Sequence, residues 1–403
     1  MKKIPIALII VFFISINTYS QVSELIKKGK QEDSLGHYKD GLGFFEQALQ
    51  LDSSYAEIFN LKGAAEYRLK DYTDAMRDIS KAIKMDPTKP DYYKGLGTVK
   101  VSTGDAQGAL ANYGKAIALD PNFADAYNGR GYVEYRQGDF VHARNDLNKA
   151  IELKPGMPEA YNNMGNVELD TRNYATSITY FDKAIELDTT LYDAYYDRAI
   201  AKTFIPDNEG AIKDFTRTLE MDPNNSRAYG NRGYAETMLH NFKAALDDCN
   251  KSLALDSLNG TSYIYRAMVK DSLKDTAGAL ADCNKAIAFN IPSALYTRGA
   301  IEYQQGDYTN ALTDFNAAIK YGYAYADEYC DRGKIEEGQG MNAFAMLDYN
   351  KALGMNAAYS PAYISRGLLK IKTGDNAGGC KDLAKAKELG NGSATALLSK
   401  YCK

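Results

Sequence analysis

Residues 124–155 read ADAYNGRGYVEYRQGDFVHARNDLNKAIELKP, and the fold is decided by how often this pattern returns. On either side of Gly138-Asp139, apolar and small residues recur at intervals of three to four, which predicts two amphipathic helices joined by a short turn. Glycine accepts the left-handed backbone conformation that ends a helix. Pro155 then stops the second helix. The stretch therefore predicts one helix-turn-helix unit.

The same pattern recurs along almost the whole chain, with Ala56, Pro90 and Ala124 each 34 residues apart. Eleven units occupy residues 21–390, and the unit from Gly260 is two residues short. The units begin at Val22, Ala56, Pro90, Ala124, Pro158, Tyr192, Ser226, Gly260, Pro292, Ala326 and Ser360. Tandem units of this length predict a solenoid in which each unit contacts only its neighbours.

Small and large residues keep fixed positions within the unit. Position 8 is Gly or Ala in every unit, whereas position 4 is Tyr in eight units and position 24 is most often aromatic. Large side chains on one helix therefore face Gly or Ala on the neighbouring helix, which predicts that the helices pack closely.

These residues resemble the tetratricopeptide-repeat (TPR) family, and the resemblance covers about nine-tenths of the chain after the leader. It implies an all-α, right-handed superhelical solenoid whose first helices line a concave groove. Two departures are local: Pro206 replaces the turn glycine of its unit, and the Gly260 unit is shortened. They leave the superhelical pitch open near residues 204–210 and 289–293.

A covariation inside the chain predicts ion pairs between the two helices of a unit. Position 7 is Arg in seven units, each with Asp sixteen residues later; Lys62 likewise has Asp78, whereas Leu96 has Asn112 and Met164 has Tyr180. The Asp thus appears only with the cation, so we expect structural pairs rather than an anion-binding row. The pairs are Arg130–Asp146, Arg198–Asp214, Arg232–Asp248, Arg266–Asp282, Arg298–Asp314, Arg332–Asp348 and Arg366–Asp382.

The N-terminus predicts export. Lys2 and Lys3 precede an apolar run from Ile4 to Ile16, and the small residues around Ser20 offer a cleavage site. Residues 1–20 are therefore interpreted as a signal peptide. The run is short for a membrane-spanning helix. No later segment is apolar enough to span, so we expect an exported protein that is periplasmic or extracellular, with association with the envelope left open.

Five cysteines are too few for a disulfide scaffold. Cys249 and Cys283 are expected to be small buried hydrophobes, and Cys330 to be a free thiol on the groove. The stretch from Cys380 to Cys402 resembles the endings of exported TPR proteins, which implies a disulfide between these two residues and a capping helix within residues 391–403.

In a TPR fold, positions 2, 5, 9, 12 and 13 of each first helix face the groove, and here these positions are rich in Tyr and Asn. Such side chains suit an extended peptide or a glycan. Asp125, Asp170 and Asp193 fall on the same positions. The tyrosines at position 12 are expected to pack on the next unit, and the side chains at positions 5 and 9 to be exposed. The candidate partner-binding residues are Asn60, Asn128, Tyr132, Tyr135, Asn162, Asn166, Tyr196, Tyr234, Tyr296 and Tyr303.

No catalytic motif occurs, and the three histidines (His37, His142 and His240) lie in different units without metal-ligand spacing. We therefore expect no catalytic residue, metal or cofactor, and no enzyme. The net charge of -4 makes nucleic acid an unfavourable partner. The sequence favours a non-catalytic scaffold that binds a segment of a partner protein. A glycan-binding module and a self-associating solenoid remain alternatives.

Overall fold

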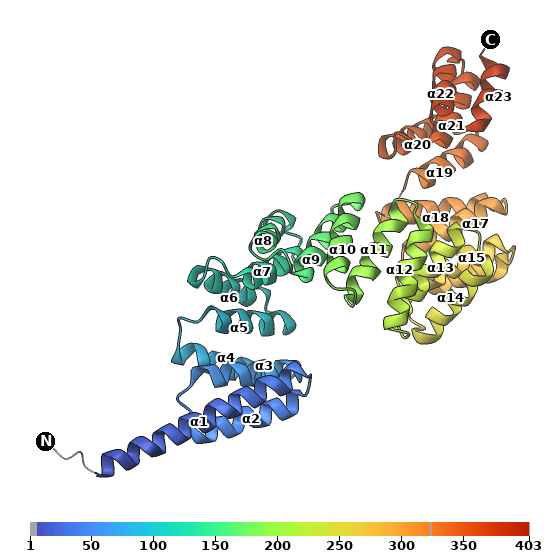
Figure 1. The fold of residues 1–403 in the computed structure, drawn as a ribbon. Helices are drawn as coiled ribbons and strands as arrows, with labels where there is room; N and C mark the ends of the chain where they lie inside the picture. The colour runs from blue at the N-terminus through green and yellow to red at the C-terminus, as the bar shows by residue number, and fades with distance from the viewer. Residues whose placement is uncertain (1–5, 323–324, 403) are drawn as a thin grey trace. The chain divides into compact units, whose positions relative to one another are not determined.

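The protein is described here by a computed structural model of residues 6–322 and 325–402, with side chains described from Tyr19 onward. In these residues all regular structure is α-helical. The helices follow one another as antiparallel pairs (Figure 1). Contacts divide the chain into two compact units, Met1–Ile205 and Pro206–Lys403. The division falls at Pro206, where the sequence departs from the repeat.

The first unit contains eleven helices. They are α1 (Ile6–Ser34), α2 (Tyr38–Leu51), α3 (Ala56–Arg68), α4 (Tyr72–Met85), α5 (Pro90–Ser102), α6 (Ala106–Leu119), α7 (Ala124–Arg136), α8 (Phe140–Leu153), α9 (Pro158–Asp170), α10 (Tyr174–Leu187) and α11 (Tyr192–Phe204). From α3 on, each odd-numbered helix begins at the first residue of a sequence unit.

The second unit contains the remaining described helices. They are α12 (Asn208–Met221), α13 (Ser226–Met238), α14 (Phe242–Leu255), α15 (Gly260–Ser272), α16 (Thr276–Ala288), α17 (Ser293–Gln304), α18 (Tyr308–Lys320), α19 (Ala326–Gly338), α20 (Asn342–Met355), α21 (Ser360–Lys372), α22 (Asn376–Glu388) and α23 (Gly392–Tyr401). Helix α17 begins one residue after Pro292, next to the shortened unit.

Helix α1 runs without a break through the end of the predicted signal peptide. Residues 1–5 lie outside the described residues, and the rest of the leader belongs to the same helix as Val22 to Ser34. The sequence from Ile6 to Lys28 contains neither Pro nor Gly, so nothing in it interrupts the helix. Among the described residues, no helix is long and apolar enough to cross a membrane.

The turn inside each helix pair has one fixed geometry. Position 15 has a positive φ, as in Gly104 (82°) and Gly138 (79°), and also where the residue is Lys70 (66°) or His240 (62°). An Asp often follows and caps the next helix, as when Asp139 accepts a hydrogen bond from the backbone N–H of His142. The turn is therefore set by the repeat even where glycine is absent.

Positions 8 and 24 interlock within each pair. A Cβ added to Gly165 would lie 2.5 Å from Cε1 of Phe181, and one added to Gly333 would lie 2.8 Å from Cε1 of Tyr349. Both aromatic side chains are buried. Glycine on the first helix thus lets an aromatic ring of the second helix fill the space between them.

The predicted Arg–Asp partners are bidentate ion pairs in six units. In the example on α19 and α20, Arg332 Nε lies 2.6 Å from Asp348 Oδ2 and Nη2 lies 2.7 Å from Oδ1. The same two bonds join Arg130–Asp146, Arg232–Asp248, Arg266–Asp282, Arg298–Asp314 and Arg366–Asp382. Lys62 Nζ also lies 2.5 Å from Asp78 Oδ2. Arg198 and Asp214 lie in different units of the structure, so their pair stays a prediction.

The guanidinium also bonds to the preceding sequence unit, a contact that the covariation did not indicate. Nη1 of Arg332 donates to Asn316 Oδ1 at 2.7 Å, and Nη1 of Arg366 donates to Asn350 Oδ1 at 2.7 Å. Arg198 makes the corresponding bond to Asp182 at 2.6 Å. We call this arrangement of Arg, own-unit Asp and preceding-unit acceptor the arginine clamp. It fixes the two helices of a unit to each other and to their predecessor.

A tyrosine and a second carboxylate complete the surroundings of the clamp. The guanidinium carbon of Arg332 lies 5.5 Å from the ring centre of Tyr329, at position 4. At position 11, four residues after the arginine, Glu134 and Glu336 each have one buried carboxylate oxygen without a hydrogen-bond partner. Burial and the nearby charge of Asp146 raise the pKa of Glu134 to about 7. Where position 11 is Lys370 instead, it joins Arg366 on Asp382, and the two cations outweigh burial to lower the pKa of Asp382.

The last helix is tied to the body of the second unit. The disulfide joins Cys380 of α22 to Cys402, directly after α23, with the Cα atoms 5.6 Å apart. Ala394 of α23 is buried. Helix α23 therefore covers the end of the helix stack. Cys249 and Cys283 are free and buried within their units.

Replacing one member of a clamp should cost more stability than replacing both. Arg332→Leu leaves Asp348, which is 5% exposed, buried without its cation, at a cost of about 3 kcal/mol or more. The double variant Arg332→Leu/Asp348→Asn copies the natural Leu96–Asn112 combination and should recover at least half of that loss. Native-state hydrogen exchange of α19 and α20 measures the local free energy of unfolding. A double variant no more stable than the single one would contradict a pairwise role.

Glu134 should make the protein less stable as the pH rises. Because the folded protein raises the pKa of Glu134 from 4.5 to about 7, only the unfolded chain loses this proton as the pH rises from 4.5 to 7, and stability falls over that range. Below pH 4.5 the carboxyl is protonated in both states. Glu134→Gln should therefore stabilise the protein at pH 8 by up to about 3 kcal/mol, with little effect at pH 4. Urea unfolding at both pH values measures the difference, with the exposed Glu159→Gln on α9 as the control. An equal gain at both pH values would refute this assignment.

Candidate partner-binding face

Within each of the two compact units, the odd-numbered helices form the inner layer. Helix α7 contacts α5 and α9, and α9 contacts α11, in addition to the even-numbered helices between them; in the second unit α15 likewise contacts α13 and α17. No two successive even-numbered helices in the described residues approach each other equally closely. The stack therefore curves with its first helices inside, as the resemblance implied.

The structure divides the ten predicted groove residues among several places. Six lie together on α7, α9 and α11, whereas Asn60 lies on α3 and Tyr234, Tyr296 and Tyr303 lie in the second unit. Nine of the ten are half-buried. In the second unit, the Tyr296 hydroxyl donates to Asp327 Oδ2 at 2.5 Å, and the rings of Tyr234 and Tyr265 lie 5.0 Å apart. Only the group on α7, α9 and α11 gathers Asn and Tyr side chains from three successive first helices.

Two expectations of exposure at position 5 were wrong. Asn162 is buried, with 8% of its surface exposed, because α9 is packed between α7 and α11. Cys330 is a free thiol but is buried in the core around Tyr349, with Sγ 3.9 Å from Ser365 Oγ on α21. Close approach of successive first helices covers both side chains.

The tyrosines at position 12 contribute to the core more than to the surface. Tyr67 packs against the cluster of Ala75, Ile79 and Val99, and its ring centre lies 5.8 Å from that of Tyr72. Tyr135 and Tyr303 pack against the corresponding clusters of their own units. Each of these clusters combines residues of the tyrosine's own second helix with residues of the first helix of the next sequence unit.

Hydrogen bonds connect the three helices that carry the main group. Asn163 Nδ2 donates to Asn128 Oδ1 at 2.9 Å, which joins α9 to α7. Arg136 Nη1 donates to the Tyr132 hydroxyl at 2.8 Å. The Asn166 amide interacts with Asp197, which joins α9 to α11. These bonds hold the polar side chains in a fixed arrangement.

Carboxylates lie beside these amides. Asp170 ends α9, and Asp193 and Asp197 stand one turn apart on α11. Burial raises the pKa of Asp197 to about 7, with additional effects from the charges of Asp193 and Asp170; Asn166 acts in the opposite direction. Burial and Asp170 also raise the pKa of Tyr135. The repeat positions predicted Asp170 and Asp193 at the groove but not Asp197, because position 6 is not among the expected groove positions.

We call the surface formed by Asn128, Tyr132, Asn162, Asn166, Asp170, Asp193, Tyr196 and Asp197 the inner face of the first unit. A hollow of about 200 Å³ lies beside its Tyr132 edge and is lined by Val101, Ala106, Val133 and Arg136 among others. The inner face thus combines amides, hydroxyls and carboxylates with an adjacent apolar recess.

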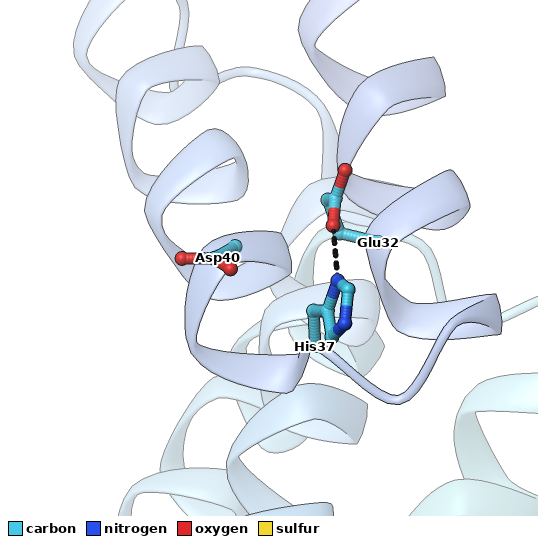
Figure 2. A group of neighbouring side chains, drawn as sticks. All are labelled: Glu32, His37 and Asp40. Carbon is cyan, nitrogen blue, oxygen red and sulfur yellow. Dashed lines mark hydrogen bonds and ion pairs between the residues drawn. The ribbon is translucent and has the colours of Figure 1, made fainter.

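A group of possible metal ligands lies elsewhere, at the turn between α1 and α2. Figure 2 shows Glu32 and His37 pointing toward each other, with Asp40 beside them on α2. His37 Nδ1 lies 2.8 Å from Glu32 Oε2, and both His37 and Asp40 are exposed. The contact is that of a surface ion pair or hydrogen bond across a turn.

Family models agree with this architecture. Models described as TPR repeat match residues 97–138 and 131–171, one described as tetratricopeptide repeat matches residues 26–90, and one described as the ETO1 C-terminal domain matches residues 159–329. The chain is a tetratricopeptide-repeat protein. A search of curated proteins finds no match to it.

Solved structures show the same fold in other TPR proteins. A tetratricopeptide repeat protein from Parabacteroides merdae aligns with 61% of this chain and 98% of its own, at 21% identity and a TM-score of 0.54. Yeast Tom70 aligns with 94% of this chain and 95% of its own, at 15% identity and a TM-score of 0.50. These likenesses show the fold alone. Proteins built from this repeat bind protein or peptide partners and are in general non-catalytic scaffolds.

Proposed function

We propose that this TPR protein is an exported interaction scaffold whose inner face binds an extended segment of a partner protein. The observation that carries the proposal is the convergence of Asn128, Asn166 and two tyrosines, Tyr132 and Tyr196, from three successive first helices. An extended peptide exposes an N–H and a C=O at every residue, and amide side chains can pair with both. Tyrosine adds apolar contact area with a hydrogen-bonding end.

The side chains of the inner face are already held in place by hydrogen bonds, which favours a role in binding over that of an ordinary solvated surface. Asn128 and Asn166 are already held by Asn163 and Asp197, and Tyr132 is held by Arg136. Side chains that are ordered before binding lose less entropy when the partner arrives. The hollow beside Tyr132 offers a place for one apolar side chain of the segment.

The inner face is tested by changing it without disturbing the clamps. The triple variant Tyr132→Ala/Asn166→Ala/Tyr196→Ala should lose at least 90% of the partner recovered when the tagged full chain is cross-linked in its native cells and purified. Asn148→Ala/Tyr321→Ala removes residues of the same kinds from exposed sites on α8 and after α18, and should recover the partner as the unmodified chain does. Unchanged recovery with the triple variant would move the site off the inner face.

Export makes a separate prediction about the N-terminus. If the protein is exported, the chain isolated from the extracytoplasmic fraction should begin near Gln21, with residues 1–20 removed. Mass spectrometry of the N-terminal peptide measures this directly. An intact Met1 in a chain recovered from the cytoplasm would contradict export and leave the binding proposal in place.

A further inference from the structure

Helix α20 of the second unit carries large apolar side chains on its solvent side. Phe344 is 60% exposed and Leu347 is 64% exposed, although the core side of the same helix is buried through Ala345, Tyr349 and Ala352. Phe344 and Leu347 are positions 19 and 22 of their sequence unit, where the other ten units have Gly, Ala or a polar or charged residue. A helix that is apolar on every side is normally covered on every side. The solvent side of α20 is therefore a candidate docking surface.

Lysines, and no exposed carboxylate of α20, accompany these two side chains. Lys351 stands one turn after Leu347 on the same side of the helix and is exposed. The only carboxylate of α20, Asp348, is buried in its arginine clamp. In the next unit, Lys381 of α22 occupies the position that corresponds to Leu347 and is also exposed. Neither lysine forms an ion pair with another described residue.

The last part of the chain is basic although the whole chain is acidic. Residues 341–403 contain nine Lys and Arg against four Asp and Glu, whereas the residues before them contain 39 against 48. Two of the four acids, Asp348 and Asp382, are buried in clamps. Asp375 caps α22, and Glu388 pairs with a lysine of its own helix. The positive charge around the outer side of α20 is thus mostly unopposed.

We call Phe344, Leu347, Lys351 and Lys381 the outer patch. Its two apolar side chains present on the order of 250 Å², whereas a stable protein interface buries roughly 800 Å² on each partner. A second copy of the chain that used the same patch would also bring the lysines of both copies together, and like charges repel. The outer patch is therefore poorly suited to self-association.

A lipid surface matches the same features. It needs no complementary pocket, because protruding apolar side chains can enter the boundary between headgroups and acyl chains. Lysine stems lie along apolar surface while the ammonium reaches outward to phosphate groups. Anionic headgroups attract basic side chains near the surface. Apolar and basic side chains side by side on a solvent-facing helix thus favour an anionic membrane surface as the occupant.

We propose that the outer patch docks the protein on a membrane surface that contains anionic phospholipids. Phe344 and Leu347 enter the acyl-chain boundary, and Lys351 and Lys381 bind the phosphate groups. This inference goes beyond the proposed function and does not depend on it, since the outer patch lies in the second unit and the inner face lies in the first. Loss of one leaves the other in place.

The chain has no Trp, so a single introduced tryptophan reports on its own surroundings. The full-length variant Phe344→Trp is mixed with vesicles of phosphatidylethanolamine and phosphatidylglycerol whose acyl chains are brominated. Bromine quenches only a tryptophan that reaches the acyl chains, so attachment through residues 1–20 does not give the signal. Emission should fall by at least half. Val141→Trp, at a site on α8 that is 67% exposed, is the matched control and should change by less than a tenth.

Charge variants test the choice of an anionic surface. In the Phe344→Trp background, Lys351→Glu/Lys381→Glu should raise the lipid concentration needed for half-maximal quenching at least tenfold. Lys115→Glu/Lys251→Glu makes the same change of charge at exposed lysines on α6 and α14 and should shift it less than twofold. Vesicles of phosphatidylcholine alone should quench at least tenfold less well. Circular dichroism of each variant controls for folding.

The outcomes leave the inference open to refutation. An unquenched tryptophan in the Phe344→Trp variant would overturn membrane docking. Equal quenching by phosphatidylcholine vesicles, or after Lys351→Glu/Lys381→Glu, would overturn the role of anionic lipid. A dimer in sedimentation, or a cross-linked protein, that is lost in Phe344→Glu/Leu347→Glu while vesicles have no effect would assign the outer patch to a protein partner instead.

Discussion

The arginine clamp is the interaction on which the rest of the structure depends. One guanidinium binds the Asp of its own second helix through two parallel bonds, and in most units also an Asn, Asp or Thr of the preceding one. Because the same guanidinium bonds to both sequence units, the clamp sets both the distance between the two helices of a unit and the distance to the preceding unit. Interlocking of Gly and aromatic residues at positions 8 and 24 then fills the space that the clamp defines.

The clamps lie between the helices, so the inner side of the odd-numbered helices is not needed to hold the clamps together. Charged residues that hold the units together are matched within the described chain, as Arg332 is by Asp348, so they cancel. The carboxylates of α9 and α11 form no such ion pair among the described residues, and burial, together with the charges of Asp193 and Asp170, raises the pKa of Asp197 to about 7. The charges that hold the helices together can therefore be told apart from the carboxylates of α9 and α11 by whether the described chain supplies a cation.

Much of this architecture follows from the sequence because the chain repeats itself. Eleven copies exposed the covariation of Arg130 with Asp146 and its absence at Leu96 and Asn112. The starts of the first helices from Ala56 to Gly260 follow from the 34-residue period, since a start found in one unit gives the starts of the others. The left-handed turns at Lys70 and His240 were not evident from residue type, because tertiary packing imposes them.

The site was less predictable, since it depends on distances between helices. Asn162 was expected to be exposed, but the approach of α7 and α11 buries it. Asp197 lies at a position that the repeat alone does not assign to the groove, and the third bond of the clamp links residues whose types vary between Asn316 and Asp182. The repeat period shows on which face of a helix a side chain lies, but not how much of that side chain the neighbouring helix covers.

The most direct test of the account is a hydrogen–deuterium exchange footprint of the full chain with and without its bound partner. The account predicts that added protection is confined to the peptides that cover α7, α9 and α11 in the first unit. Protection on the even-numbered helices, or only in the second unit, would contradict the assignment of the inner face as the binding site.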